Sequence, residues 1–309
     1  MMKPKRQKMN QKPTTKPELQ RINQKMNEKP RKIYDVIYDV FDSLETNNFA
    51  TIGKPDAAMF ERPLIGVAAG DDPYYEFLKS HIGEFHWSPQ EVFALKYKDV
   101  PDSSCLRVIS LVFPQTEETK NMQNTAKVFP CDNWVVSRGE WEPMMGEFAS
   151  KVEGAFDRMG IRSAALDLRS EFHRQDSENL GIASVWSHRH SAFAAGLGTF
   201  GLNDGFISER GIAVRITSIV IEADIDITPR GDIGHYDWCL HYSKGICGAC
   251  IKRCPVSAIS KENGHDKDSC LEYEDYAIEH YWPEHIERGD YIFGCGLCQS
   301  RVPCRDRRP

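Results

Sequence analysis

Residues Cys247–Pro255 read CGACIKRCP, and this stretch decides the character of the C-terminal part of the chain. Its spacing, Cys-x2-Cys-x3-Cys-Pro, is typical of the run that holds the clusters in bacterial two-cluster iron–sulfur proteins. In that run the cysteine before proline ligates the other cluster, so the two cysteine sets are interwoven. The usual first cysteine would stand at Lys244, which cannot ligate, and Cys239 is the available replacement.

Eight of the ten cysteines lie between Cys239 and Cys304, and this clustering indicates metal ligation rather than disulfides. The interwoven pattern predicts one [4Fe–4S] cluster on each of two sets. The first set is Cys239, Cys247, Cys250 and Cys304, and the second is Cys254, Cys270, Cys295 and Cys298. CxxC pairs also build tetrahedral zinc sites, but the Cys-x3-Cys-Pro element favours iron–sulfur clusters. The remaining Cys105 and Cys131 are predicted to be structural.

The composition is that of an ordinary globular protein, with 40% hydrophobic and 27% charged residues among 309. No run approaches the roughly 18 apolar residues of a membrane span, and the start carries no export signal. We therefore expect a cytoplasmic protein without a membrane partner. Residues 1–32 carry eleven basic and two acidic side chains, which predicts a disordered leader or, alternatively, a basic arm for nucleic acid or an acidic partner.

The chain after the leader is acidic, with 28 basic against 43 acidic side chains. An acidic body is a poor match for a large phosphate-bearing substrate, so a nucleic-acid partner is not expected. Hydrophobic spacing predicts a helix at Ile33–Leu44 and another within Arg138–Gly160. Apolar runs predict strands, and these are Leu64–Ala68, Leu106–Phe113, Ile161–Leu168 and Gly211–Ile225.

The order strand–helix–strand favours an α/β domain. The turn-rich segment Thr228–Gly234 is the predicted boundary. The predicted class is therefore α+β, with a leader at 1–32, an α/β domain at 33–228 and a bacterial-ferredoxin-like two-[4Fe–4S] domain at 229–309.

Several motifs resemble the epoxyqueuosine reductase family and, more distantly, the reductive dehalogenases, which are corrinoid-dependent iron–sulfur reductases. The sequences of these motifs are similar to those of an uncharacterised ferredoxin-like branch of this group. The resemblance extends over roughly residues 105 to 304. The motifs are Arg189–Asn203, the strand at Ile212–Ile221, Cys247–Pro255, Gly264–Lys267, Cys270 and Gly294–Gln299. The resemblance implies a tetrapyrrole-sized cavity over an α/β sheet.

The resemblance also implies that the loop Gly196–Asn203 lies against a corrin, such as cobalamin. Its candidate cofactor-binding residues are Gly196, Gly198, Gly201 and Asn203. Glycines let the backbone approach a flat macrocycle and leave bare N–H groups for its amide side chains. The alternative is a tight helix-to-strand turn without a ligand. The string Gly-x-Gly-x-x-Gly follows a helix-like stretch rather than a strand, which disfavours NAD.

Candidate catalytic residues are His188 and His190 as proton donors and Arg189 as an anion clamp. The alternative is that all three line a polar helix face in contact with solvent. Epoxyqueuosine reductases have a carboxylate proton donor just upstream, whereas Gly181–His188 contains no Asp or Glu. Five residues follow Cys304, so we expect no helical-repeat extension of the kind that some reductases carry. Both departures disfavour queuosine chemistry.

The predicted function is an iron–sulfur oxidoreductase that passes electrons through two clusters to a bound corrinoid acting on a small-molecule substrate. A ferredoxin- or flavodoxin-type protein is the expected electron donor. The alternatives are an electron-transfer protein without substrate chemistry of its own, and tRNA modification of the epoxyqueuosine type.

Overall fold

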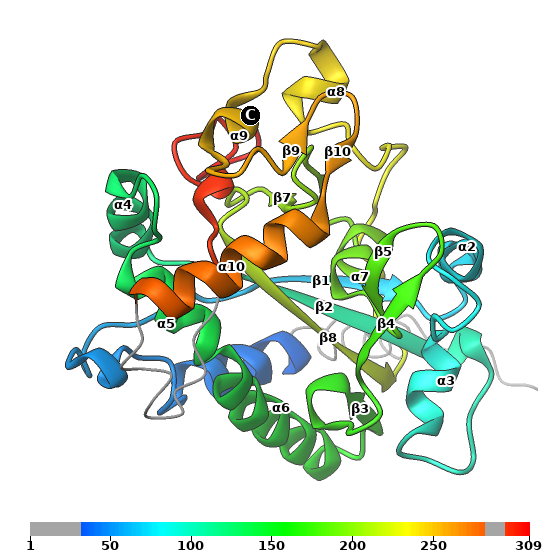
Figure 1. Cartoon of the computed structure of the whole chain (residues 1–309). Coiled ribbons are helices and arrows are strands. Elements are labelled where there is room, and N and C mark those ends of the chain that lie inside the picture. The colour runs from blue at the N-terminus through cyan, green and yellow to red at the C-terminus, as the bar shows by residue number, and fades with distance from the viewer. Residues whose placement is uncertain (1–31, 282–293) are drawn as a thin grey trace, which may run out of the picture.

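The computed structural model describes residues 32–281 and 294–309 (Figure 1). The predicted leader lies outside these residues except for Lys32. Within the described part, four strands form the central sheet in the order β1-β2-β8-β3. These strands are β1 (Leu64–Ala69), β2 (Leu106–Pro114), β8 (Val214–Glu222) and β3 (Ser163–Ala165).

All pairings in this sheet are antiparallel. Ile109 of β2 lies opposite Val67 of β1 on one side and Ile219 of β8 on the other. The predicted mixed helix-and-sheet class is confirmed. The strand–helix–strand order does not reveal the antiparallel pairing, because β2 and β8 are brought together across a hundred residues of chain.

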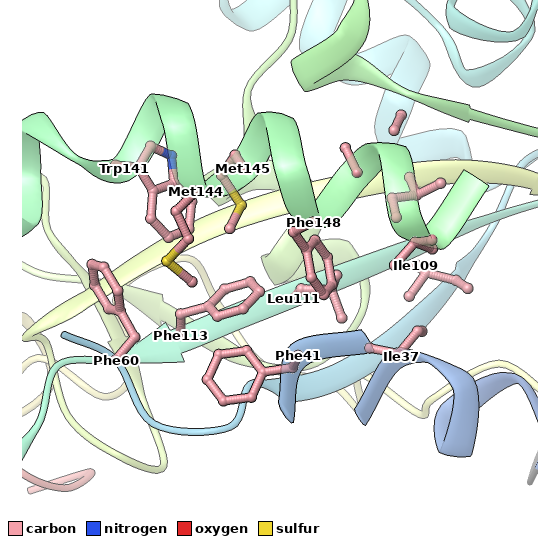
Figure 2. Close-up of a cluster of buried hydrophobic side chains, with 14 of the residues drawn as sticks. Ile37, Phe41, Phe60, Ile109, Leu111, Phe113, Trp141, Met144, Met145 and Phe148 are labelled. Atoms are coloured by element: carbon pink, nitrogen blue, oxygen red, sulfur yellow. The ribbon is translucent and has the colours of Figure 1, made fainter. Parts of the chain in front are cut away.

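Helices cover both faces of the sheet, so β2 is buried on both sides. Ile109, Leu111 and Phe113 face a core formed with residues 32–42, which are helical, and with α6. Figure 2 shows this core, in which the Phe113 ring lies 5.4 Å from that of Trp141 and 5.5 Å from that of Phe148. Successive strand side chains alternate between faces, so Val108 and Val112 belong to the opposite core.

The side chains of preceding residues cap helices before the cysteine-rich part, including α2 (Pro73–His81) and α3 (Pro89–Ala94). Asp72 accepts a hydrogen bond from the Tyr74 amide at the start of α2, and Ser88 with Glu91 forms a capping box at α3. The helices are α2 (Pro73–His81), α3 (Pro89–Ala94), α4 (Glu117–Thr125), α5 (Asp132–Gly139), α6 (Trp141–Arg158) and α7 (His188–Ala194). The single helix predicted within 138–160 is α6, and the predicted strand at 161–168 continues after β3 as the 3₁₀ turn η3 (Leu166–Leu168).

Short ribbons and turns complete this part. The paired strands are β4 (Arg174–Ser177) with β5 (Gly181–Ser184) and β6 (Gly198–Phe200) with β7 (Phe206–Ser208). The 3₁₀ turns are η1 (Ala50–Ile52) and η2 (Ser103–Cys105).

The cysteine-rich part lies at one end of the sheet (Figure 1). Its elements are α8 (Leu240–Lys244), α9 (Ala249–Arg253), β9 (Ile259–Ser260), β10 (Gly264–His265), α10 (Lys267–Tyr281) and η4 (Leu297–Gln299). One small core joins Leu202, Ile207 and Ile212 to Trp238, Ile259 and Val302. This core crosses the predicted boundary at residue 228, which stays a prediction.

Candidate metal centre

The first set of four cysteines lines one pocket. Cys239 precedes α8, Cys247 and Cys250 flank the start of α9, and Cys304 comes from the C-terminal tail. The pocket encloses about 380 Å³, part of it open to solvent. The loop residues Gly201, Leu202 and Asn203 form another part of its wall. The structure thus brings together four thiols that span 65 residues of sequence.

Mutual electrostatic effects identify the same set. Burial first, and then the neighbouring Cys239 and Cys247, raise the pKa of Cys250 to about 11. Burial likewise raises the pKa of Cys304 to about 12, with added effects from Cys239, Cys250 and Cys247. Buried thiols whose negative charges repel one another are fully deprotonated only when a cation binds them. A metal cluster meets this requirement.

The second set gathers between α9, α10 and η4. Burial raises the pKa of Cys270 to about 12, with contributions from Glu274 and Cys254. The pKa of Cys295 also rises to about 12, again by burial first and then through Glu274, Cys270 and Cys254. Burial raises the pKa of Cys298 well above its usual value, and Cys295 and Cys270 add to the effect.

Each set therefore supplies four thiols to one place, as a [4Fe–4S] cluster requires. Among residues 32–281 and 294–309, no three His, Cys, Asp or Glu side chains converge as the ligands of a single metal ion do. The first set instead surrounds a larger space. The donor chemistry of both sets fits iron–sulfur clusters.

Backbone and side chains of the α/β part hold the second set in place. The Gln123 amide donates a hydrogen bond to the Cys295 carbonyl at 2.9 Å, and the Cys295 N–H donates to the Glu274 carboxylate at 3.2 Å. Gly296 has a φ of 57°, and a Cβ there would lie 2.1 Å from the Trp134 ring. Only glycine satisfies both conditions.

Asn203 connects the two sets. Its side-chain amide lies 3.3 Å from both the carbonyl oxygen and the Sγ atom of Cys298, and it donates to them. Its Oδ1 accepts from the Gly205 N–H at 3.2 Å. Because Asn203 also lines the first pocket, it touches both thiol sets. The sequence comparison with corrinoid enzymes suggested a different role for it.

The other loop residues predicted to bind a corrin are occupied by the chain's own packing. The Gly196 N–H donates to the Phe193 carbonyl at 2.9 Å, and the Gly201 N–H donates to the Gly205 carbonyl at 2.8 Å. A Cβ at Gly198 would lie 2.1 Å from the Ile207 carbonyl oxygen. The expected bare N–H groups are therefore absent at Gly196 and Gly201. The corrin-binding role of Gly196, Gly198, Gly201 and Asn203 stays a prediction.

His188, Arg189 and His190 point in different directions, because successive helix residues are rotated by about 100°. His188 Nδ1 lies 2.8 Å from the Ser218 Oγ on the sheet. The Arg189 guanidinium donates to the Asp204 carbonyl at the surface. His190 Nδ1 lies 2.7 Å from the Ser187 Oγ. The three side chains do not form one site.

The electrostatics of the two histidines differ from the prediction. Burial lowers the pKa of His188 to about 4 and that of His190 well below its usual value. Both imidazoles are neutral at pH 7 and hold no ready proton for donation. His188 and His190 are partly exposed and Arg189 is exposed, so the alternative of a helix face that touches solvent stays open. The Nε2 atom of His188 is buried without a hydrogen-bond partner among the described residues.

Two features were not found from the sequence. His190 belongs to an aromatic cluster with His81 and His235, whose ring centroids lie 6.0–6.1 Å apart. Asp167 is a buried carboxyl that accepts a hydrogen bond from Thr217, and burial raises its pKa to about 6. The members of each feature come from distant segments, and no local spacing marks them.

A protein-family model described as "4Fe-4S double cluster binding domain" matches residues 245–304. The curated epoxyqueuosine reductase of Leadbetterella byssophila is 29% identical over 121 residues, or 38% of this chain and 35% of that protein. The enzyme of Cyclobacterium marinum is 26% identical over 118 residues, or 37% and 36%. The chain thus matches about a third of the length of these relatives.

Two solved structures illustrate the likeness in fold. The epoxyqueuosine reductase of Bacillus subtilis aligns with a TM-score of 0.45 and 15% identity, over 89% of this chain and 67% of that one. The catabolic reductive dehalogenase NpRdhA aligns with a TM-score of 0.41 and 17% identity, over 68% and 27%. No helix in the described parts of the chain has the length and apolar character needed to cross a membrane. The chain is an iron–sulfur protein with a domain for two 4Fe–4S clusters, and it is related to the epoxyqueuosine reductases.

Proposed function

We propose that this chain is an iron–sulfur reductase in which each thiol set holds one [4Fe–4S] cluster. The observation that supports it best is the gathering of eight cysteines into two sets of four that meet at Asn203. When bound, such clusters supply one-electron storage and transfer. The chain's own residues provide the thiolates, bury the second set and donate hydrogen bonds to sulfur. The curated relatives are reductases, which favours an enzyme acting on a small substrate, with an electron-donor protein as partner.

A corrinoid acceptor stays a prediction of the resemblance. The loop residues Gly196 and Gly201 give it no support, because their N–H groups already donate to backbone carbonyls. We derive no step through a corrinoid.

A second candidate is an electron-transfer protein without substrate chemistry of its own. It is favoured by the loop Gly196–Asn203, because the N–H groups of Gly196 and Gly201 already donate to backbone carbonyls. The names of the curated relatives keep a third candidate open, modification of tRNA. We place the protein in the cytoplasm, because cysteines clustered for metal ligation rather than for disulfides are typical of a reducing compartment.

The deciding experiment is anaerobic purification after expression with cobalamin supplied, followed by analysis of iron, zinc and cobalt in one sample. About eight irons per chain are expected for two [4Fe–4S] clusters. Near-stoichiometric cobalt together with iron would establish a corrinoid reductase. Iron without cobalt would favour the electron-transfer protein, and zinc without iron would contradict the proposal.

A further inference from the structure

The surface around the first thiol set carries an unusual charge. Residues 239–261 contain four basic side chains and no acidic one, and residues 301–309 contain four arginines and one aspartate. In contrast, residues 33–228 contain seventeen basic and thirty acidic side chains. These two stretches, which contribute all four cysteines of the first set, therefore carry an excess of cations, and α8 and α9 belong to the first of them (Figure 1).

Apolar side chains are exposed among these cations. Ile246, next to Cys247, is 74% exposed, and Tyr236 and Tyr242 are 39% and 47% exposed. The two tyrosine rings lie 4.4 Å apart, and Tyr242 is within electrostatic range of the thiols Cys239 and Cys250. These apolar residues therefore lie beside the residues that line the first pocket, which include Cys239, His241 and Cys247.

The basic residues surround the same place. Lys244 ends α8, Lys252 lies on α9, and the Lys261 side chain runs along Gly248 in the pocket wall. The three lysines are exposed. The Arg308 guanidinium lies 4.4 Å above the ring of Trp238, which precedes Cys239. We call Tyr236, Tyr242, Lys244, Ile246, Lys252 and Lys261 the rim surface.

We propose that the rim surface is the docking site of a small acidic electron-carrier protein. Lysines outnumber acidic side chains around these apolar residues, although Asp237 and Glu262 are exposed beside them. An exposed apolar centre bordered by an excess of one charge steers a partner of opposite charge and then excludes water from the contact. In each encounter the reduced carrier loses one electron and the centre on the first thiol set gains it. This inference rests on the proposed function, because it requires a cluster on these thiols.

An RNA partner is the other class that basic and aromatic residues attract. The protein carrier is favoured because the rim surface adjoins the first thiol set, with Ile246 next to Cys247 and Tyr242 within electrostatic range of Cys239 and Cys250. A short path for an electron matters there, whereas a phosphate backbone gains nothing from it. A protein carrier also explains why Ile246 is exposed, because an apolar side chain can pack against a protein surface but does not bind phosphates.

The test uses the full-length protein with its iron in place and a reduced acidic flavodoxin as the probe. The variant Lys244→Glu/Lys252→Glu reverses two charges of the rim surface. The matched control, Lys98→Glu/Arg174→Glu, reverses two exposed charges, one shortly after the end of α3 and one on β4. Iron content and the midpoint potential of each variant are measured first, and dithionite reduction serves as the carrier-independent rate.

We expect the rim variant to be reduced by flavodoxin about 10–100-fold more slowly than the wild type at low salt, since steering by charge changes association rates by this order. The gap should shrink as salt screens the charges, while reduction by dithionite stays unchanged. Equal slowing in the control, or no slowing in the rim variant, would overturn the inference. Loss of binding to a tRNA stem-loop with unchanged flavodoxin rates would overturn it in favour of RNA. A wild type without iron would refute the proposed function instead.

Discussion

The first thiol set lies under an exposed surface, whereas the second lies against α5 and α10 and takes part in the packing of the α/β part. Both consist of four cysteines, so their chemistry is the same. The difference lies in what surrounds them: Tyr242 and Ile246 near solvent in one case, Trp134 and Gln123 in the other. Position in the fold thus suits the first set to exchange with partners and makes the second set part of the framework.

The largest effect should come from removing one ligand of each set. Cys250→Ser and Cys298→Ser are each expected to lose about half of the iron, because a cube needs four ligands. Only Cys298→Ser should also lower the temperature of thermal unfolding markedly, since its set is fixed to α5 and α10. Iron analysis and thermal unfolding under anaerobic conditions measure both effects. Complete loss of iron in either variant would show that the two sets do not form independently.

Substitution of one glycine beside each set should show how tightly the chain is packed around that set. Gly296→Ala forces a left-handed φ on alanine and drives its Cβ into Trp134, so we expect a loss of about 2–4 kcal/mol in the free energy of unfolding. Gly245→Ala, beside the first set, has a φ of 68° but open space, and should cost about 1–2 kcal/mol. Denaturant unfolding compares them. Equal losses would mean that the second set is not packed more tightly.

A pH experiment should test the electrostatics on the side of the second set, where the pKa of Asp167 is raised. Glu142 is within electrostatic range of both Asp167 and Arg138, and Arg138 of Cys270. Because the pKa of Asp167 is raised in the folded state, its stabilising contribution is full below about pH 4 and is lost as the pH rises through about 6. Relative to wild type, Asp167→Asn should therefore gain about 1–2 kcal/mol between pH 5 and pH 8. A difference that does not change with pH would contradict the raised pKa.

The smallest effect concerns the potential of one cluster. Asn203→Leu removes the N–H donor to the Cys298 sulfur, so the thiolate becomes more electron-rich and the second cluster harder to reduce. A redox titration followed by electron paramagnetic resonance should show a lower midpoint for that cluster and little change for the first. Asn263→Leu, an exposed asparagine between β9 and β10, is the control. Equal shifts of both midpoints would argue against a local hydrogen bond.

The cysteine sets could be anticipated from the sequence because their spacing is local and the chemistry of thiols is specific. The glycine loop could not, since Gly196 and Gly198 are equally suited to a ligand and to the chain's own backbone. Because His188, Arg189 and His190 are adjacent in sequence, they were predicted to share one site. Successive helix residues point in different directions, however, and the three side chains contact different partners. The contacts of Asp167 with Thr217 and of His235 with His190 could not be predicted, because each joins segments that are distant in sequence.

Cys304 lies in a C-terminal segment whose position is fixed by contacts with Ile212 and Lys120. The Ile212 N–H donates to the Cys304 carbonyl at 2.8 Å, and Lys120 forms an ion pair with Glu117 at 2.7 Å and lies 3.9 Å from Asp306. The earliest and the latest of the eight cysteines, Cys239 and Cys304, therefore share one pocket. During synthesis on the ribosome, a nascent chain lacks the fourth thiol of this pocket until residue 304 has emerged. Cluster insertion at the first set must then follow translation of the whole cysteine-rich part, and the cell's iron–sulfur delivery machinery meets a nearly finished fold.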